Sequence, residues 1–156
     1  MEYEQTKKVL AALEQEKVCY VIIGGVALNL LGLPRATQDL DLFIAPDREN
    51  IARLRKALHL VFDDASIDEI SAEDLLGEYP AVQYVPPSGT FTIDILTRLG
   101  KAFKFNDLES QRINFEELTI SVVTAQTLYQ MKKGTVRPRD WDDAASLKQR
   151  FKIKED

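Results

Sequence analysis

The chain has 156 residues, of which 45% are hydrophobic and 29% are charged, a balance typical of globular domains. A chain of this length predicts one domain, here residues 1–156. No apolar run approaches the ~20 residues that span a bilayer, and the opening residues, Met-Glu-Tyr-Glu, lack the basic charge of a signal peptide. Composition therefore argues against a membrane protein.

The net charge of −5 is opposite to the basic excess of most nucleic-acid-binding proteins. Two basic stretches, within 101–104 and 132–139, still leave RNA open as a binding partner. The single cysteine, Cys19, excludes an internal disulfide and fits a reducing cytoplasm. Its apolar surroundings in the sequence predict a small buried side chain.

Hydrophobic periodicity and turn residues predict alternating helices and strands in the first half of the chain. The expected elements are an amphipathic helix at 3–17, a strand at 18–23, a short helix at 26–31, a strand at 39–44, and a helix that runs from its N-cap Asp47 to about Leu58. The segment 63–78 then carries seven acids and no basic residue. It predicts either a solvated loop with a helical turn after Ser71 or a mobile flap near a metal site.

The second half of the chain is expected to begin with a β-hairpin and to end with helices. The expected elements are strands at 81–85 and 90–96 around the turn 86–89, a short edge piece at 103–105, one or two strands within 112–123 that lead out of the sheet, and helices at 125–133 and from Pro138 to about Arg150. Thr124 is a candidate N-cap for the first of these helices.

Asp39 and Asp41 are separated by one residue within a predicted strand. Since side chains alternate along a strand, both carboxylates lie on one face, whereas Leu40 and Leu42 lie on the other. Neighbouring carboxylates repel each other, and desolvation adds to the cost. A hard divalent cation relieves both effects, and Mg²⁺ typically uses one or two carboxylates together with substrate phosphates.

Gly24-Gly25 lies between the first predicted strand and the short helix. Glycine lets the backbone turn tightly and approach another group closely, and the free amides at the start of a helix favour phosphate. Together with the two carboxylates, this makes the stretch 22–44 a predicted metal–triphosphate site.

Gly-Gly followed by Asp-x-Asp on a strand resembles the polymerase-β-like nucleotidyltransferase superfamily. That superfamily takes a third carboxylate from a later strand, and Asp94 in Phe91-Thr-Ile-Asp-Ile-Leu96 stands in the matching position. The form Arg35-x-Thr37-x-Asp39-x-Asp41 is narrower and resembles the AbiE-type abortive-infection toxins and their small bacterial and archaeal relatives. The run Lys132-x4-Arg137-x-Arg139-Asp140-x-x-Asp143 is similar to the Lys…Arg…Lys/Arg-Asp-x-x-Asp signature of the same group.

This resemblance implies an α/β (α+β) fold with a mixed twisted sheet flanked by helices, a catalytic core at about 18–96 and a C-terminal helical part at about 124–151. It implies that Asp39, Asp41 and Asp94 are the catalytic residues and hold two Mg²⁺ ions, for which Mn²⁺ is an alternative. The residues expected to contact the nucleotide are Gly24, Gly25, Asn29, Arg35, Thr37, Lys132, Arg137 and Arg139.

The implied reaction is metal-dependent transfer of a nucleoside monophosphate from a nucleoside triphosphate, such as ATP, to a hydroxyl acceptor. The acceptor stays open between RNA and protein. So do a role as the toxin of a toxin–antitoxin pair with an antitoxin partner, and self-association into a homo-oligomer. The alternative function is a catalytically silent nucleotide-binding or protein-interaction module with the same fold. Arg139 and Asp140 have a structural alternative as an ion pair between helices.

Overall fold

The computed structural model describes residues 3–87, 89 and 91–154, and a mixed β-sheet lies at their centre. Within these residues, six strands form the sheet in the order β3 (Ala81–Tyr84), β4 (Thr92–Leu96), β2 (Asp39–Ile44), β1 (Tyr20–Ile23), β8 (Leu118–Val123) and β7 (Ser110–Phe115). β4 is parallel to β2 and β8 is parallel to β1, whereas the other neighbouring pairs are antiparallel. The expected mixed sheet is confirmed. A short separate hairpin consists of β5 (Arg98–Leu99) and β6 (Phe103–Lys104).

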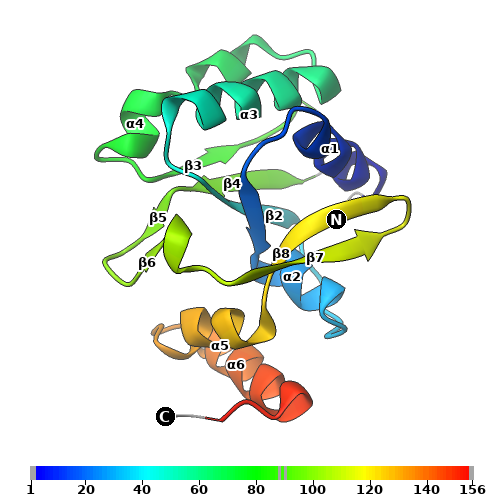
Figure 1. The fold of residues 1–156 in the computed structure, drawn as a ribbon, viewed down its shortest axis with the longest axis vertical. Helices are drawn as coiled ribbons and strands as arrows, with labels where there is room; N and C mark the ends of the chain where they lie inside the picture. Colours follow the sequence, from blue (N-terminus) through cyan, green and yellow to red (C-terminus); the bar gives the residue numbers. More distant parts are fainter. Residues whose placement is uncertain (1–2, 88, 90, 155–156) are drawn as a thin grey trace.

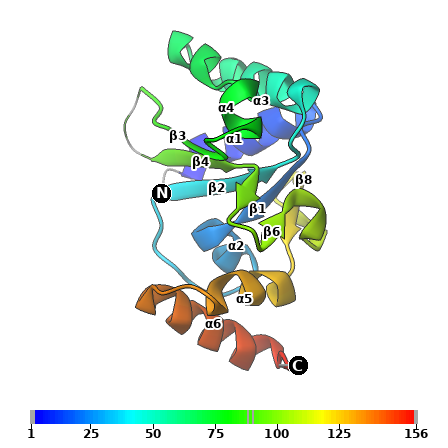
Figure 2. The ribbon, with the colours of Figure 1, turned by 90° about the vertical axis from the view of Figure 1, so that its left-hand side faces the viewer.

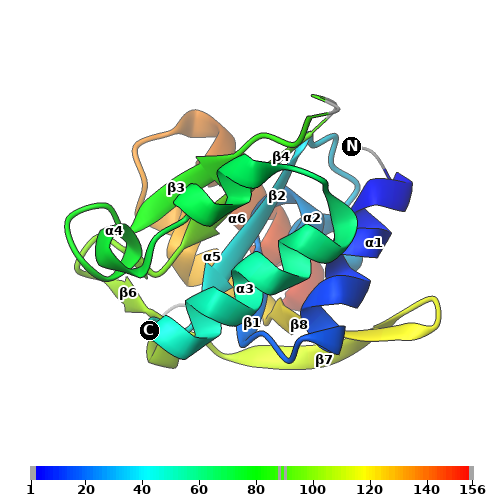
Figure 3. The ribbon, with the colours of Figure 1, turned by 90° about the horizontal axis from the view of Figure 1, so that it is seen from above.

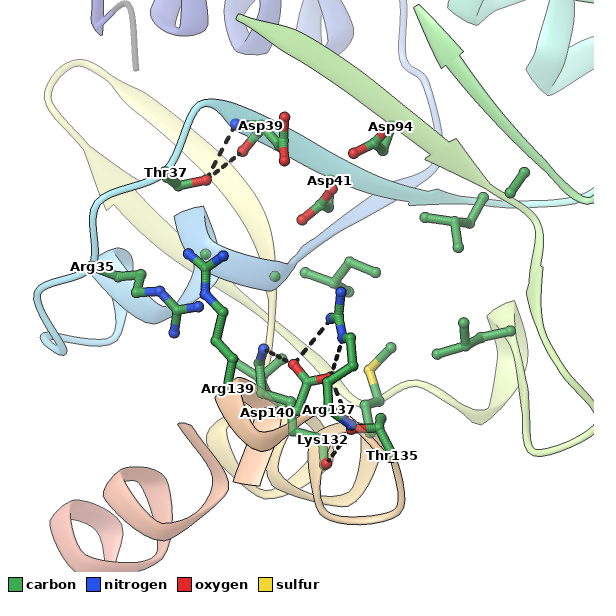
Figure 4. A pocket seen from close by; sticks show the side chains of 18 of the residues that line it. Arg35, Thr37, Asp39, Asp41, Asp94, Lys132, Thr135, Arg137, Arg139 and Asp140 are labelled. Atoms are coloured by element: carbon green, nitrogen blue, oxygen red, sulfur yellow. Dashed lines mark hydrogen bonds and ion pairs between the residues drawn. The ribbon is translucent and has the colours of Figure 1, made fainter. Parts of the chain in front are cut away.

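Helices cover both faces of the sheet (Figures 1 and 2). One layer holds α1 (Tyr3–Gln15), α3 (Arg48–Val61) and α4 (Ala72–Leu76), and Figure 3 looks down on it. The other layer holds α2 (Gly24–Leu30), α5 (Ala125–Lys133) and α6 (Pro138–Phe151). Side chains alternate along β2, so that the fully buried Leu40 and Leu42 point into the first layer. Asp39 and Asp41 consequently face the layer of α2, α5 and α6 (Figure 4).

Polar N-caps start two of the helices at the predicted places. The Asp47 carboxylate accepts a hydrogen bond from the Asn50 amide at 2.7 Å, and Thr124 Oγ1 accepts one from the Thr127 amide at 3.3 Å. Such caps satisfy amides that have no partner within the helix. Pro138 occupies the first turn of α6, where its missing N–H costs no helical hydrogen bond.

The acidic segment 63–78 is a folded part of the first layer. It forms a 3₁₀ turn at Ala65–Glu69 and then α4, whose N-cap is Ser71. Ile67 and Leu75 bury their side chains in the core. The helical turn after Ser71 is therefore confirmed, whereas the interpretation as a flap near the metal site is wrong. The segment packs beside α3, on the face of the sheet opposite α5 and α6 (Figure 1), and the candidate metal ligands face those two helices (Figure 4).

Two other features differ from the expected ones, namely the position of β8 in the sheet and the start of α2. The stretch within 112–123 contributes two strands, and β8 lies inside the sheet next to β1 instead of leading out of it. Local periodicity does not reveal this, because it says nothing about which distant strand is the neighbour. α2 begins at Gly24, so the glycine pair belongs to the helix. In the expected hairpin, β3 and β4 pair as predicted, and Ser88 and Thr90 lie outside the described residues.

Asn50 joins the start of α3 to the entry of β1. Its fully buried side chain accepts a hydrogen bond from the Cys19 amide at 2.7 Å and donates to the carbonyls of Cys19 and Ala45 at 3.0 and 3.1 Å. The Cys19 carbonyl also accepts a hydrogen bond from the Ala45 amide at 3.1 Å, and β1 starts at the next residue, Tyr20. The Cys19 side chain is exposed, and the prediction of a buried cysteine is wrong.

Replacing Asn50 by alanine is expected to lower the free energy of unfolding by about 2–4 kcal/mol, because the change leaves buried backbone groups without partners. Urea denaturation measures the effect. The exposed Asn106 provides a control, since Asn106→Ala is expected to change stability by about 0.5 kcal/mol or less. A loss at Asn50 no larger than that at Asn106 would contradict the bridging role.

Candidate active site

A cleft of about 720 Å³ opens between the sheet and the α5–α6 pair. Asp39 and Asp41 of β2 and Asp94 of β4 line one side of it (Figure 4). In the parallel pairing of β2 with β4, Asp41 stands opposite Asp94, and Asp39 stands opposite Thr92. The strand register thus brings together the three carboxylates that the sequence singles out.

The carboxylates carry more negative charge than their surroundings neutralise. Burial, then the hydrogen bond and charge of Asp94, and then the charge of Asp39 raise the pKa of Asp41 well above its usual range. The positive charge of Lys132 opposes this shift without cancelling it. A bound cation would relieve the same repulsion, because it favours the ionised form of each carboxylate.

The donor set fits magnesium. Among the residues described, no group of three or more His, Cys, Asp or Glu side chains is arranged to hold a metal ion by itself. Mg²⁺ does not need such a cage, because it uses one or two carboxylates and completes its shell with water and substrate phosphates. Asp39, Asp41 and Asp94 supply only oxygen donors, which suit Mg²⁺ or Mn²⁺.

The two glycines make room for the site. Gly24 has a φ of +71°, which L side chains rarely adopt, and a Cβ at this position would lie 2.0 Å from Asp41 Oδ2. A Cβ at Gly25 would lie 2.9 Å from the Cβ of Thr37. Close approach to protein groups is therefore one requirement at both positions, in addition to the phosphate contact predicted from the sequence.

Two threonines hold Asp39 in place. Thr37 Oγ1 accepts a hydrogen bond from the Asp39 amide at 3.2 Å and donates to its carbonyl at 3.1 Å. Thr92 Oγ1 donates to Asp39 Oδ1 from the neighbouring strand. Partners of this kind orient the oxygens of a metal ligand. Sequence reasoning missed Thr92, although its place two residues before Asp94, on the same strand face, is a usable signal.

Arginines lie on the other side of the cleft. Arg35 comes from the loop between α2 and β2, Arg137 precedes α6, and Arg139 belongs to the first turn of α6. The side chains of Arg137 and Arg139 extend toward the carboxylates (Figure 4). Among the described residues, Arg139 has no ion-pair partner, so its guanidinium is available to an anion. The planar guanidinium fork matches phosphate oxygens in shape and charge.

Lys132 is buried between two carboxylates of α6. Its ammonium nitrogen lies 3.2 Å from Asp140 Oδ1 and 2.9 Å from Asp143 Oδ2. Asp140 also accepts hydrogen bonds from the Arg137 guanidinium at 2.7 and 3.1 Å. The alternative of an Arg139–Asp140 ion pair is therefore wrong, because consecutive residues of a helix point in different directions and Asp140 already has Lys132 and Arg137 as partners.

Asn29 does not reach the cleft. Its carboxamide oxygen accepts a hydrogen bond from the Arg35 amide at 2.6 Å, which fixes the loop that carries Arg35. The expected nucleotide contacts that do line the cleft are Gly24, Gly25, Arg35, Thr37, Lys132, Arg137 and Arg139. Asn29 thus acts on the site from outside, through the position of this loop.

The charge state of Asp140 predicts how acid affects the protein. Burial raises the pKa of Asp140, but hydrogen bonds from Arg137, Thr135 and Lys132 outweigh it and lower the pKa from 3.8 to about 2. A carboxylate with a lowered pKa stabilises the folded state above pH 3.8, and this contribution is lost as the pH falls through 2. Asp140→Asn is therefore expected to lower stability at pH 7 by about 2 kcal/mol.

The same variant is expected to lose less stability than wild type when the pH falls from about 5 to about 2, since it has no carboxylate to protonate. Chemical denaturation at both pH values measures the difference. Asp142→Asn, on the exposed face of α6, serves as the control and is expected to follow wild type. Equal acid sensitivity of Asp140→Asn and wild type would exclude this role of Asp140.

Comparison with known proteins agrees with the geometry. A family model described as nucleotidyl transferase AbiEii toxin, type IV TA system, matches residues 8–155. The fold is similar to the crystal structure of a candidate nucleotidyltransferase from Thermotoga maritima, with a TM-score of 0.56 and 16% identity over 98% of this chain and 94% of that chain. The curated proteins contain no significant match. Because the family model spans the sheet, the cleft and the C-terminal helices, the chain belongs to the AbiEii family of nucleotidyltransferase toxins of type IV toxin–antitoxin systems.

Proposed function

We propose that this chain transfers a nucleoside monophosphate from a nucleoside triphosphate to a hydroxyl acceptor, with Mg²⁺ as its cofactor. The observation that supports this most strongly is the strand register, which places Asp41 opposite Asp94. Three carboxylates therefore lie on one side of the cleft, and three arginines line the other side. Carboxylates suit a divalent cation, and guanidinium groups suit phosphate oxygens. A triphosphate chelated to Mg²⁺ complements both sides of the cleft at once.

In the proposed reaction, the acceptor oxygen forms a bond to the α-phosphorus, and the bond from this phosphorus to the bridging oxygen of the β-phosphate breaks. Pyrophosphate is the leaving group. Asp39, Asp41 and Asp94 hold the cation, and Asp94 accepts the proton of the acceptor hydroxyl. Arg137 and Arg139 bind the non-bridging phosphate oxygens. Bound Mg²⁺ supplies charge neutralisation and lowers the pKa of the acceptor hydroxyl.

Family membership bears on the biological partners of this chain. The family consists of toxins of toxin–antitoxin systems, and we extend this to an antitoxin partner for this chain. The acceptor hydroxyl is part of an RNA or a protein. None of the helices described is long and apolar enough to cross a membrane. Cytoplasmic location and self-association stay predictions from the sequence.

Thermal denaturation with each of the four nucleoside triphosphates, with and without Mg²⁺, tests the proposal. A triphosphate present at a hundred times its Kd adds about 2.7 kcal/mol of stability, which raises Tm by about 5–10 °C in a domain of this size. The stabilisation is expected to require Mg²⁺ or Mn²⁺. Absence of any shift, with either metal and any of the triphosphates, would overturn the proposal.

Transfer itself is measured with α-phosphate-labelled triphosphate, total bacterial RNA and total bacterial protein. Label on either acceptor supports the enzyme and identifies the acceptor class. Metal-dependent stabilisation by a triphosphate without label on either acceptor would favour the alternative, a silent nucleotide-binding module.

A further inference from the structure

A cluster of charged side chains, in which Lys132, Asp140 and Asp143 are buried and Arg137 is exposed, supports the arginine side of the cleft. It consists of Arg35, Lys132, Arg137, Asp140 and Asp143, which we call the α5–α6 charge cluster. Lys132 forms an ion pair with each of the two carboxylates, Arg137 forms one with Asp140, and Arg35 forms one with Asp143. Three cations and two carboxylates leave the cluster with an excess of one positive charge on the side of the cleft that faces the three aspartates.

Asp143 differs from the other members because it does not line the cleft. It lies behind Arg35, and the two residues together line a separate cavity of about 230 Å³. Arg35 lines both spaces, so its side chain separates the cleft from Asp143. The Asp143 side chain is only 11% exposed. Asp143 is therefore placed to act on a bound ligand through Arg35, without touching the ligand.

Two side chains fix Arg35 within the loop between α2 and β2. This loop has no helix or strand structure from Gly32 to Gln38, apart from single-residue turns and bends. Asn29 fixes the Arg35 backbone from one end, and Asp143 fixes its guanidinium from the other. An unfixed arginine would lose side-chain entropy on binding phosphate, which weakens the binding. The guanidinium has five N–H donors, so the contact with Asp143 leaves donors free for a ligand.

We propose that Asp143 is a positioning residue for the triphosphate. It holds Arg35 in the orientation that binds phosphate oxygens, while the buried Lys132 keeps Asp143 and Asp140 together and so fixes Arg35 and Arg137 at once. Lys132 then acts through its two carboxylate partners, and not as the direct phosphate contact expected from the sequence. This inference rests on the proposed function, because it assigns a role within the same triphosphate site.

A double-mutant cycle separates positioning from general stabilisation. The probe is inorganic tripolyphosphate with Mg²⁺, which carries the phosphates without a base, and isothermal titration calorimetry measures its Kd. Arg35→Gln and Asp143→Asn are each expected to raise the Kd about tenfold. Because Asp143 acts through Arg35, the double variant is expected to bind no more than about twofold more weakly than Arg35→Gln alone. Asp142→Asn, one residue away on the exposed face, is the control and is expected to bind as wild type does.

Two results would overturn the inference alone: normal affinity in Asp143→Asn, or additive losses that reach about a hundredfold in the double variant. Absence of binding by wild type would overturn the proposed function and the inference together. If Asp143→Asn does not fold, as judged by circular dichroism, Asp143→Glu replaces it, since it keeps the charge but moves the oxygens by one methylene. Asp143→Glu is expected to bind at least threefold more weakly than wild type, and unchanged affinity would overturn the inference.

Discussion

Replacing Asp41 by asparagine is expected to abolish nucleotidyl transfer and, at the same time, to make the metal-free protein more stable. Under the proposed function, transfer should fall by roughly a thousandfold or more, because Mg²⁺ would lose one of its proposed ligands. Stability should rise because the folded state raises the pKa of Asp41, which means that it disfavours the ionised carboxylate. Asparagine has nearly the same shape and no charge to bury.

The sign of the pH dependence follows from the same shift. A carboxyl group whose pKa is raised on folding destabilises the folded state once the pH exceeds its unfolded pKa, near 3.8. The gain from Asp41→Asn should therefore be small at pH 4 and should grow toward pH 8, where it should exceed about 1 kcal/mol, the value of one pKa unit. Denaturation without metal measures this gain, and label transfer with Mg²⁺ measures activity.

The exposed Asp63 is a matched control, since Asp63→Asn removes a carboxylate that lies away from the cleft. It is expected to leave both transfer and stability close to wild type. A variant at Asp41 that keeps near-normal turnover would refute its assignment as a metal ligand. A loss of metal-free stability at pH 8 would show instead that the carboxylates are already compensated by the protein.

Replacing Gly24 by alanine is expected to damage both the fold and the site. The new Cβ would lie 2.0 Å from Asp41 Oδ2, so the carboxylate must move. The backbone must also keep alanine at a φ of +71°, which costs about 1–2 kcal/mol. We expect a loss of about 2–4 kcal/mol of stability and at least about a hundredfold in transfer, because a displacement of about 1 Å in a catalytic group has an effect of that size.

A variant at Gly100 distinguishes the backbone cost of a positive φ from the clash with Asp41. Gly100 also has a positive φ, +58°, but a Cβ there would meet no atom within 4 Å. Gly100→Ala should therefore show the backbone cost of about 1–2 kcal/mol and keep full transfer. Gly134→Ala, with open space and no positive φ, should show neither effect. If Gly24→Ala behaved like Gly100→Ala, the close approach to Asp41 would have no functional importance.

The structure changes the interpretation of the C-terminal sequence signature. The sequence signature that extends from Lys132 to Asp143 suggested direct phosphate contacts, yet the structure surrounds Lys132 with carboxylates and leaves Arg139 facing the cleft. A signature residue can therefore act through its neighbours. Which cation stays available to an anion depends on the ion pairs that the others form, and Lys132 of α5 pairs with Asp143 of α6.

Some features were determined by the sequence alone, because they depend on near neighbours in the chain. The alternation of strand side chains placed Asp39 and Asp41 on one face. The caps of α3 and α5 could be predicted from Asp47 and Thr124, because a cap needs only the following three residues. Motif spacing also identified the family, which the family model then confirmed.

Other features were decided only by the tertiary structure, because they depend on contacts between distant segments. The pairing of Asp41 with Asp94 requires the parallel register of β2 and β4, and a slip of one residue would turn Asp94 to the opposite face. The hydrogen bonds of the Cys19 backbone with Asn50 join residues 31 positions apart in the chain. The contact of Arg35 with Asp143 exists only once α6 has packed beside the loop. The local sequence pattern therefore predicts which chemical groups share a face of an element, whereas long-range packing decides which of these groups contact one another.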